Sequence, residues 1–110
     1  MRLRDARPRQ IIKDERAPTI LRRLGRPTFI TIDMWYWERG LCDRRYCIAC
    51  FPLSNPEQHL IPDLLRRLLR LPQFRTRAAR MGKVIRVRVE EIEYWQLGDP
   101  ELHQLQWPEA

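Results

Sequence analysis

Asp33 is the residue whose type and position most directly suggest chemistry. It follows a short, apolar, β-rich run, residues 28–32, and precedes three consecutive aromatic residues. A carboxylate at the end of a buried strand lies beside the crevice where open α/β sheets usually bind ligands, so it can hold a metal ion or a reacting group. The alternative role for Asp33 is to cap the turn that follows the strand. The sequence leaves both roles open.

Positive charge is the second chemical feature, and it is unevenly placed within the net charge of +7. Residues 1–27 contain nine Lys or Arg against three Asp or Glu, and residues 62–88 contain nine against one. Residues 89–110 contain six acidic residues and no Lys or Arg. The excess favours nucleic acid as a partner, because arginine makes bidentate contacts with phosphate. The alternatives are a solvated surface or a match between the basic and acidic parts of the chain.

The candidate nucleic-acid contacts come from the turn before the second predicted strand and from two predicted helices. They are Arg44, Arg45, Arg66, Arg67, Arg70, Arg77 and Arg80, with Arg75 and Lys83 extending the same basic stretch. Trp35, Tyr36 and Trp37 are candidates for stacking on nucleic-acid bases. Packing of these three rings against a helix or against a partner subunit is the alternative.

The three cysteines, Cys42, Cys47 and Cys50, do not form a recognisable metal or disulfide pattern. Cys47 and Cys50 have the spacing of a Cys-x-x-Cys motif, but no second pair accompanies them and both histidines are distant. If residues 46–51 form a strand, these two side chains point to opposite faces. We therefore predict buried, free thiols that pack as small apolar groups.

The elements that position these residues follow from the hydrophobic pattern. Residues 18–25 predict a short helix with Pro18 in its first turn, and residues 28–32 and 46–51 predict strands, the first covered on both faces. Residues 60–71 have leucines at helical spacing and predict an amphipathic helix. Residues 73–81 predict another short helix.

A hairpin closes the predicted domain. Residues 84–89 alternate, with Ile85, Val87 and Val89 expected inward, and the phase slips at residues 90–91 before a second strand over residues 92–97. The order of elements predicts a small α/β fold: a largely parallel sheet of three to four strands, with a C-terminal antiparallel hairpin and helices packed on it.

The predicted domain organisation has three parts. Residues 1–17 form a basic N-terminal arm, residues 18–97 form the α/β domain, and residues 98–110 form an acidic tail. The sequence contains no apolar run long enough to span a bilayer and no secretory signal, so we expect a cytoplasmic protein. Exposed strand edges and the apolar stripe of the 60–71 helix make a homodimer the expected assembly.

Three stretches carry a family resemblance: PTFITIDMWYW, RRYCIACF and LLRRLLRLPQFRTRAARMGKVIRV. In this order they resemble the C-terminal half of PIN-like domain proteins, a family of small α/β proteins often found as toxins or nucleases in bacteria and archaea. Asp33 in Thr31-Ile32-Asp33 matches an acidic position of that family. The likeness covers roughly residues 18–97. The family's first strand, which ends in a central Asp, has no counterpart here, so the chain resembles a truncated or degenerate member.

The resemblance implies a divalent-metal site. Asp33 would be a catalytic residue that binds Mg²⁺ or Mn²⁺, Glu38 would be a further metal ligand, and Asp43 would assist catalysis, with Asp14 as another acidic candidate. Arg44, Arg45 and Arg66 would hold phosphates. The alternative for Asp43 is an ion pair with Arg44 or Arg45.

Three functions stay open from the sequence. The first is a metal-dependent ribonuclease of toxin–antitoxin type, or its remnant. The second is a non-catalytic nucleic-acid-binding module that uses the basic helix face. The third is a protein-interaction subunit that completes its sheet with a second copy or with another protein such as an antitoxin.

Overall fold

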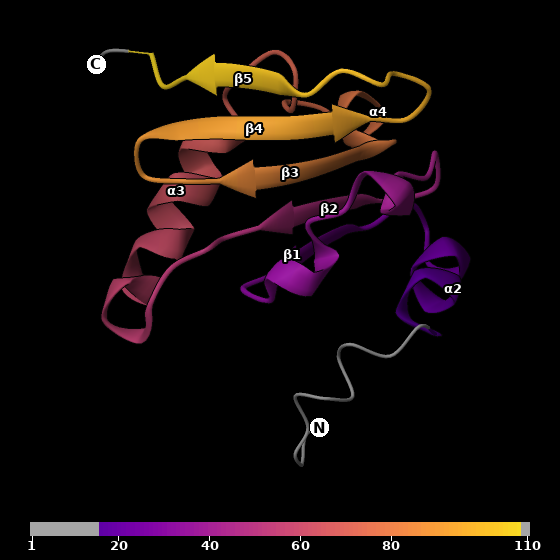
Figure 1. The fold of residues 1–110 in the computed structure, drawn as a ribbon, viewed down its shortest axis with the longest axis horizontal. Coiled ribbons are helices and arrows are strands. Elements are labelled where there is room, and N and C mark those ends of the chain that lie inside the picture. The colour runs from indigo at the N-terminus through magenta and orange to yellow at the C-terminus, as the bar shows by residue number, and fades with distance from the viewer. Residues whose placement is uncertain (1–15, 109–110) are drawn as a thin grey trace.

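The computed structural model describes residues 16–108. Asp14 and residues 1–15 of the predicted arm lie outside them, while residues 16 and 17 of that arm begin α2. The α-helices are α2 (Arg16–Arg23), α3 (Ile61–Leu68) and α4 (Arg77–Arg80). The strands are β1 (Thr28–Thr31), β2 (Cys47–Cys50), β3 (Lys83–Val87), β4 (Glu91–Gln96) and β5 (His103–Gln106). Short 3₁₀ helices, η1 (Met34–Tyr36), η2 (Arg39–Leu41) and η3 (Asn55–Leu60), lie in the connections (Figure 1).

The strands form one mixed sheet in the order β1-β2-β3-β4-β5. Strands β1, β2 and β3 are parallel, with Phe29 opposite Ile48 and Ile48 opposite Val84. Strands β4 and β5 continue the sheet in antiparallel pairing. The predicted α/β class with a C-terminal hairpin is confirmed, but the sheet has five strands instead of three or four.

The additional strand, β5, lies in the segment that we predicted to be an acidic tail. Its sequence, HQLQ, places only Leu105 on the core side, so no apolar pattern marks it. Pairing with β4 supplies its backbone hydrogen bonds. Just beyond β5, the Trp107 indole N–H donates to the Arg88 carbonyl oxygen at 2.9 Å, and this contact ties the C-terminal segment to the sheet.

One face of the sheet packs against α3. The buried side chains Ala49, Ile85 and Ile92 from the strands meet Leu64 and Leu68 from the helix. The helix is shorter than the predicted range of residues 60–71. It is preceded by the 3₁₀ helix η3, whose start is capped by reciprocal bonds between Ser54 and Glu57, and a turn follows it.

The other face packs against α2 and the connection between β1 and β2. Buried Ile48 and Cys50 of β2 meet Leu21 of α2 and Tyr36 of η1. Because β1 and β2 are parallel neighbours, this connection runs back along the length of the strands, from the end of β1 to the start of β2. Figure 1 shows the two 3₁₀ helices of this crossing on the side of the sheet opposite to α3.

One prediction about the N-terminal part is wrong. We predicted that β1 is covered on both faces, but Ile30 is 37% exposed because α3 lies over β2 and β3 and does not reach β1. In the α2 segment, Leu21 is buried and Ala17 packs beside it against the sheet, while Ile20 and Leu24 are exposed.

The hairpin of β3 and β4 is confirmed, with Ile85 and Val87 buried as predicted. Val89 is 45% exposed, which corrects its predicted inward position, since β3 ends before it and the chain turns there. The 73–81 helix is reduced to α4, although Phe74 is buried. None of the helices in residues 16–108 is long and apolar enough to span a membrane.

Candidate nucleic-acid interface

Asp33 lies at the carboxyl end of β1 and caps the helix η1. Its Oδ1 accepts a hydrogen bond from the Trp35 amide at 2.9 Å, and its own amide donates to the Thr31 hydroxyl at 3.0 Å. A short acidic side chain is favoured at such a cap because it accepts an otherwise unpaired backbone N–H. The capping role that the sequence left open is therefore present.

Asp43 lies at the other end of the sheet, in the turn before β2. Its Oδ1 accepts a hydrogen bond from the Arg45 amide at 2.8 Å, and its Oδ2 lies 3.6 Å from Nη1 of Arg22 in α2. The carboxylate therefore orders its own turn and pairs with one arginine. That arginine is Arg22, and not the side chain of Arg44 or Arg45 as the ion-pair alternative expected.

The carboxylates assigned to metal binding do not form a shared site. Asp33 follows β1 and Asp43 precedes β2. Because these strands are parallel, the two carboxylates lie at opposite ends of the strands. Glu38 is exposed within the crossing between them. Within residues 16–108, no three His, Cys, Asp or Glu side chains lie close enough together to hold a metal ion. These residues do not fit a common Mg²⁺ or Mn²⁺ centre.

The carboxyl edge of the sheet instead contains a pairing that the sequence analysis missed. Glu93 in β4 is buried, and its Oε1 lies 2.8 Å from Nε and 2.6 Å from Nη2 of Arg86 in β3. Arg88 adds a third nitrogen at 3.8 Å. The signal was present in the hairpin register, since residues 86 and 93 face each other across the strands.

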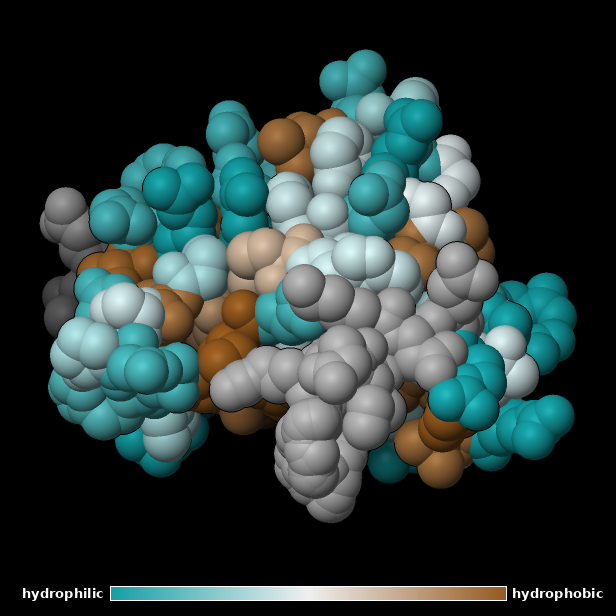
Figure 2. Space-filling model, turned by 60° about the horizontal axis from the view of Figure 1, so that its bottom comes forward, coloured by the Kyte–Doolittle hydropathy of each residue, from teal (hydrophilic) through white to brown (hydrophobic). Residues whose placement is uncertain are grey.

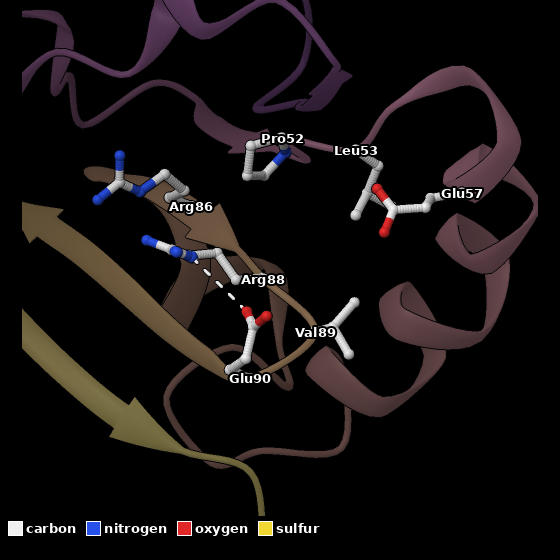
Figure 3. A pocket seen from close by; sticks show the side chains of 7 residues that line it. All are labelled: Pro52, Leu53, Glu57, Arg86, Arg88, Val89 and Glu90. Atoms are coloured by element: carbon white, nitrogen blue, oxygen red, sulfur yellow. Dashed lines mark ion pairs between the residues drawn. The ribbon is translucent and has the colours of Figure 1, made fainter.

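A cavity of about 340 Å³ opens at this edge (Figure 3). Its lining comes from the ends of β2 and β3 and from η3: Pro52, Leu53, Glu57, Arg86, Arg88, Val89 and Glu90. Figure 3 shows the Arg88 side chain directed towards Glu90, with which it forms an ion pair at 3.8 Å. The positive charges here are therefore matched by carboxylates of the protein.

The amino edge of the parallel strands has the opposite character. Exposed arginines from three separate connections lie within six residues of the start of a parallel strand. We call them the amino-edge arginines: Arg23 and Arg26 before β1, Arg44 and Arg45 before β2, and Arg77 before β3. None of the five side chains has a carboxylate partner within the described residues 16–108. Guanidinium groups stay protonated at all ordinary pH values, so the edge is permanently positive.

Direct contacts bring these connections together. Arg22 of α2 pairs with Asp43 of the second connection, and Nε of Arg80 in α4 donates to the Thr28 hydroxyl at the start of β1 at 2.9 Å. A shallow hollow of about 340 Å³ lies among Arg22, Asp43, Arg44 and Arg45. Figure 2 shows hydrophilic side chains gathered at the right-hand end of the molecule, where Figure 1 places α2.

The predicted arginine contacts have different surroundings. Arg44, Arg45 and Arg77 belong to the amino edge, as described above. Three others are engaged within the protein: Arg66 pairs with Asp63, Arg67 lies over the Trp107 ring at 4.4 Å, and Arg80 also donates to the Phe74 carbonyl oxygen at 2.9 Å. Arg70 is exposed in the turn that follows α3.

The aromatic trio is mostly committed to packing. Tyr36 is buried, and its ring makes edge contacts with Phe29 and Trp35. Trp37 lies 6.1 Å from the Trp95 ring, with the Arg86 guanidinium stacked over it at 4.6 Å. The packing alternative therefore holds for Tyr36 and Trp37. Trp35 is 38% exposed and stays a candidate for stacking.

Besides Asp43, acidic groups near the amino edge lie in the loop between β4 and β5. Asp99 accepts a hydrogen bond from the Glu101 amide at 2.9 Å, and its other oxygen lies 2.8 Å from the His103 ring. These two contacts hold the pKa of Asp99 below its usual range, the backbone hydrogen bond having the larger effect. The Asp99 carboxylate thus pairs within its own loop.

No protein-family model, curated protein or solved structure matches this chain.

Proposed function

We propose that this protein is a non-catalytic module that binds the phosphate backbone of nucleic acid through its amino-edge arginines. The observation that carries the proposal is the convergence of five exposed arginines, from three connections, on one edge where no described carboxylate pairs with them. Like charges that the fold brings together repel one another, so an arrangement of this kind favours an anionic partner. The carboxyl edge offers a contrast, because Arg86 and Arg88 are neutralised there by Glu93 and Glu90.

Single-stranded RNA is the ligand that this proposal favours. Within residues 16–108, the edge is built from turns and short helices, with no long helix that would enter a major groove. An exposed ring such as Trp35 would suit an unstacked base, although it lies at the other end of β1. The PIN-like resemblance supports RNA as well, since that family contains nucleases.

The test is fluorescence anisotropy with a labelled, mixed-sequence single-stranded RNA, with salt raised from 50 to 200 mM. Each backbone contact contributes about −0.7 to the slope of log K against log salt, so five contacts predict a slope of about −3.5. Arg44→Gln/Arg45→Gln should weaken binding and reduce the magnitude of the slope by between about 1 and 2. The control Arg66→Gln/Arg88→Gln removes the same charge from arginines that pair with carboxylates.

Two outcomes would contradict the proposal. Binding that does not change between the two salt concentrations would mean that phosphate contacts do not drive it. Equal losses in the two double variants would mean that total charge matters and the amino edge does not. Circular dichroism should show that both variants keep the wild-type fold.

Divalent-metal-dependent ribonuclease activity is the second candidate function, and one observation favours it. Asp33 lies at the carboxyl end of a parallel strand, the end at which α/β sheets usually hold their reacting groups. The same RNA incubated with Mg²⁺ or Mn²⁺ tests it, with wild type and Asp33→Asn prepared identically. Cleavage by wild type alone would establish this second function, and cleavage by both would rule out Asp33 as its catalytic residue.

A further inference from the structure

We propose that two copies of this chain pair antiparallel through β1 and so join their sheets into one. Strand β1 is the edge of the sheet, and no strand within residues 16–108 pairs with its outer side. An edge strand offers a row of unpaired backbone groups, which another strand can satisfy. The inference does not depend on nucleic-acid binding; in the dimer Arg26 faces a carboxylate of the other copy, so four amino-edge arginines of each chain stay without one.

The hydrogen bonds already made by β1 show which of its residues face outward. The carbonyl groups of Pro27 and Thr31 accept bonds from Cys47 and Phe51 of the β2 chain. The N–H and C=O groups of successive residues point to opposite sides of a strand, so those of Thr28 and Ile30 point to the free edge.

This direction limits the registers that the pair can adopt. In a two-fold antiparallel arrangement around Ile30, each Ile30 lies opposite the Ile30 of the other copy, and Thr28 lies opposite Ile32. These are the outward-facing residues, so the opposed residues form hydrogen-bonded pairs with both backbone groups used. A one-residue slip would oppose groups that already bond to β2 and is therefore excluded. Among the registers that oppose outward-facing residues, the side chains and charges of this edge favour the one around Ile30.

The side chains on this edge agree with the same register. Ile30 and Ile32 are 37% and 45% exposed, because α3 does not extend over β1. Pairing around Ile30 brings both isoleucines of each copy together on one face, where their contact removes apolar surface from water. Figure 2 turns this side of the molecule towards the viewer and shows hydrophobic surface between hydrophilic side chains.

Charge decides between antiparallel and parallel pairing. Arg26 precedes β1 and Asp33 follows it, so the two ends of the strand have opposite charges. In the antiparallel pair, Arg26 of one copy lies near Asp33 of the other at both ends of the interface. Parallel pairing would place like charges together, which is unfavourable. The occupant of the edge is therefore a second copy in two-fold arrangement.

The first experiment is light scattering of the full 110-residue chain over a range of concentrations. We expect a mass twice that of one chain, and Ile30→Lys should return it to the monomer value because a charged residue blocks edge pairing. The control Leu102→Lys alters a residue of matching exposure, 38%, and should leave the dimer intact. A monomer at all concentrations, or a dimer that survives Ile30→Lys, would overturn the proposal.

Two further tests, a cross-link and a charge exchange, remain if Ile30→Lys fails to fold. Ile30→Cys should form an intermolecular disulfide on mild oxidation, because Cα atoms of a hydrogen-bonded antiparallel pair lie about 5.5 Å apart, within disulfide range. Leu102→Cys should not. Asp33→Arg should weaken the dimer, and the exchanged pair Arg26→Asp/Asp33→Arg should restore it. Absence of both the cross-link and the rescue would contradict the register.

Discussion

Arg86 and Glu93 face each other across the β3–β4 hairpin, and Glu93 is 5% exposed with its Oε1 2.6 Å from Nη2 of Arg86. The guanidinium also covers the ring of Trp37 from the crossing between β1 and β2. This pair therefore connects the hairpin to the segment that carries the chain from one end of the sheet to the other.

Glu93→Gln should destabilise the fold, because it leaves the half-buried Arg86 without its counter-charge. Breaking a buried pair in this way costs about 3 kcal/mol, although the partial exposure of Arg86 lowers the figure. Glu90→Gln is the control, since that exposed pair with Arg88 should contribute less than about 1 kcal/mol. Urea unfolding followed by circular dichroism measures both. Equal effects for the two variants would mean that burial of Glu93 adds nothing.

The two buried thiols predict a loss of stability at alkaline pH. Burial is the main cause that raises the pKa of Cys47 and of Cys50 to about 12, from the ordinary value of 9.0. Between these values the unfolded chain releases the thiol protons while the folded chain retains them. The unfolding free energy therefore has its full value below pH 9 and falls as the pH rises towards 12.

At pH 10 the loss should be roughly 1 kcal/mol for each thiol relative to neutral pH. Cys47→Ala/Cys50→Ala should show a shallower fall over the same range, and the tyrosines and lysines common to both proteins cancel in the comparison. Unfolding is measured in urea with a reducing agent at pH 7.5 and pH 10. Parallel pH profiles for the two proteins would show that these thiols do not titrate as their burial predicts.

Trp107 should be required for docking of the C-terminal strand. Its indole N–H donates to the Arg88 carbonyl oxygen, and the Arg67 guanidinium lies over its ring. Trp107→Ala removes both contacts and should cost about 2 kcal/mol, less than a fully buried tryptophan because the residue is half-buried. Leu102→Ala, at a more exposed position before β5, should cost under about 1 kcal/mol.

Amide hydrogen exchange tests whether Trp107 holds β5 on the sheet. In the Trp107→Ala protein, the amides of β5 should lose protection while those of β2 and β3 keep it, because only one edge of the sheet is released. Unchanged protection in β5 would show that pairing with β4 alone holds the strand.

The contrast between β5 and the β3–β4 hairpin explains how far the sequence predicts this fold. Residues 84–89 alternate and contain three buried β-branched side chains, so the pattern alone indicates a strand. Strand β5 has one apolar residue on the core side, and its order comes from β4 and from a tryptophan contact across 19 positions of the chain. Contacts at that separation leave no local periodicity.

The candidate site was likewise predictable only in part from the sequence. The acidic and basic residues were identifiable by type, but Asp33 and Asp43 are ten positions apart and lie at opposite ends of the sheet. The segment between them contains two 3₁₀ helices and runs from one end of the strands to the other. It has no hydrophobic repeat, so the sequence does not indicate this separation. In contrast, Arg44 and Arg77 are distant in sequence, and parallel pairing brings the connections that hold them to the same edge.

Asp43 distinguishes the two proposed functions in a single substitution. It is the carboxylate that pairs with Arg22 at the amino edge, so Asp43→Asn removes a negative charge there and releases one arginine. Asparagine retains an oxygen that can accept the hydrogen bond from the Arg45 amide, so the turn should persist. Binding to single-stranded RNA should tighten by about two- to fivefold at low salt, with a slightly steeper salt dependence. A nuclease that used Asp43 as a catalytic group would instead lose its cleavage activity. Anisotropy and cleavage measured on the same Asp43→Asn preparation separate these results, and weaker binding by a folded Asp43→Asn protein would contradict the role assigned to the amino-edge arginines.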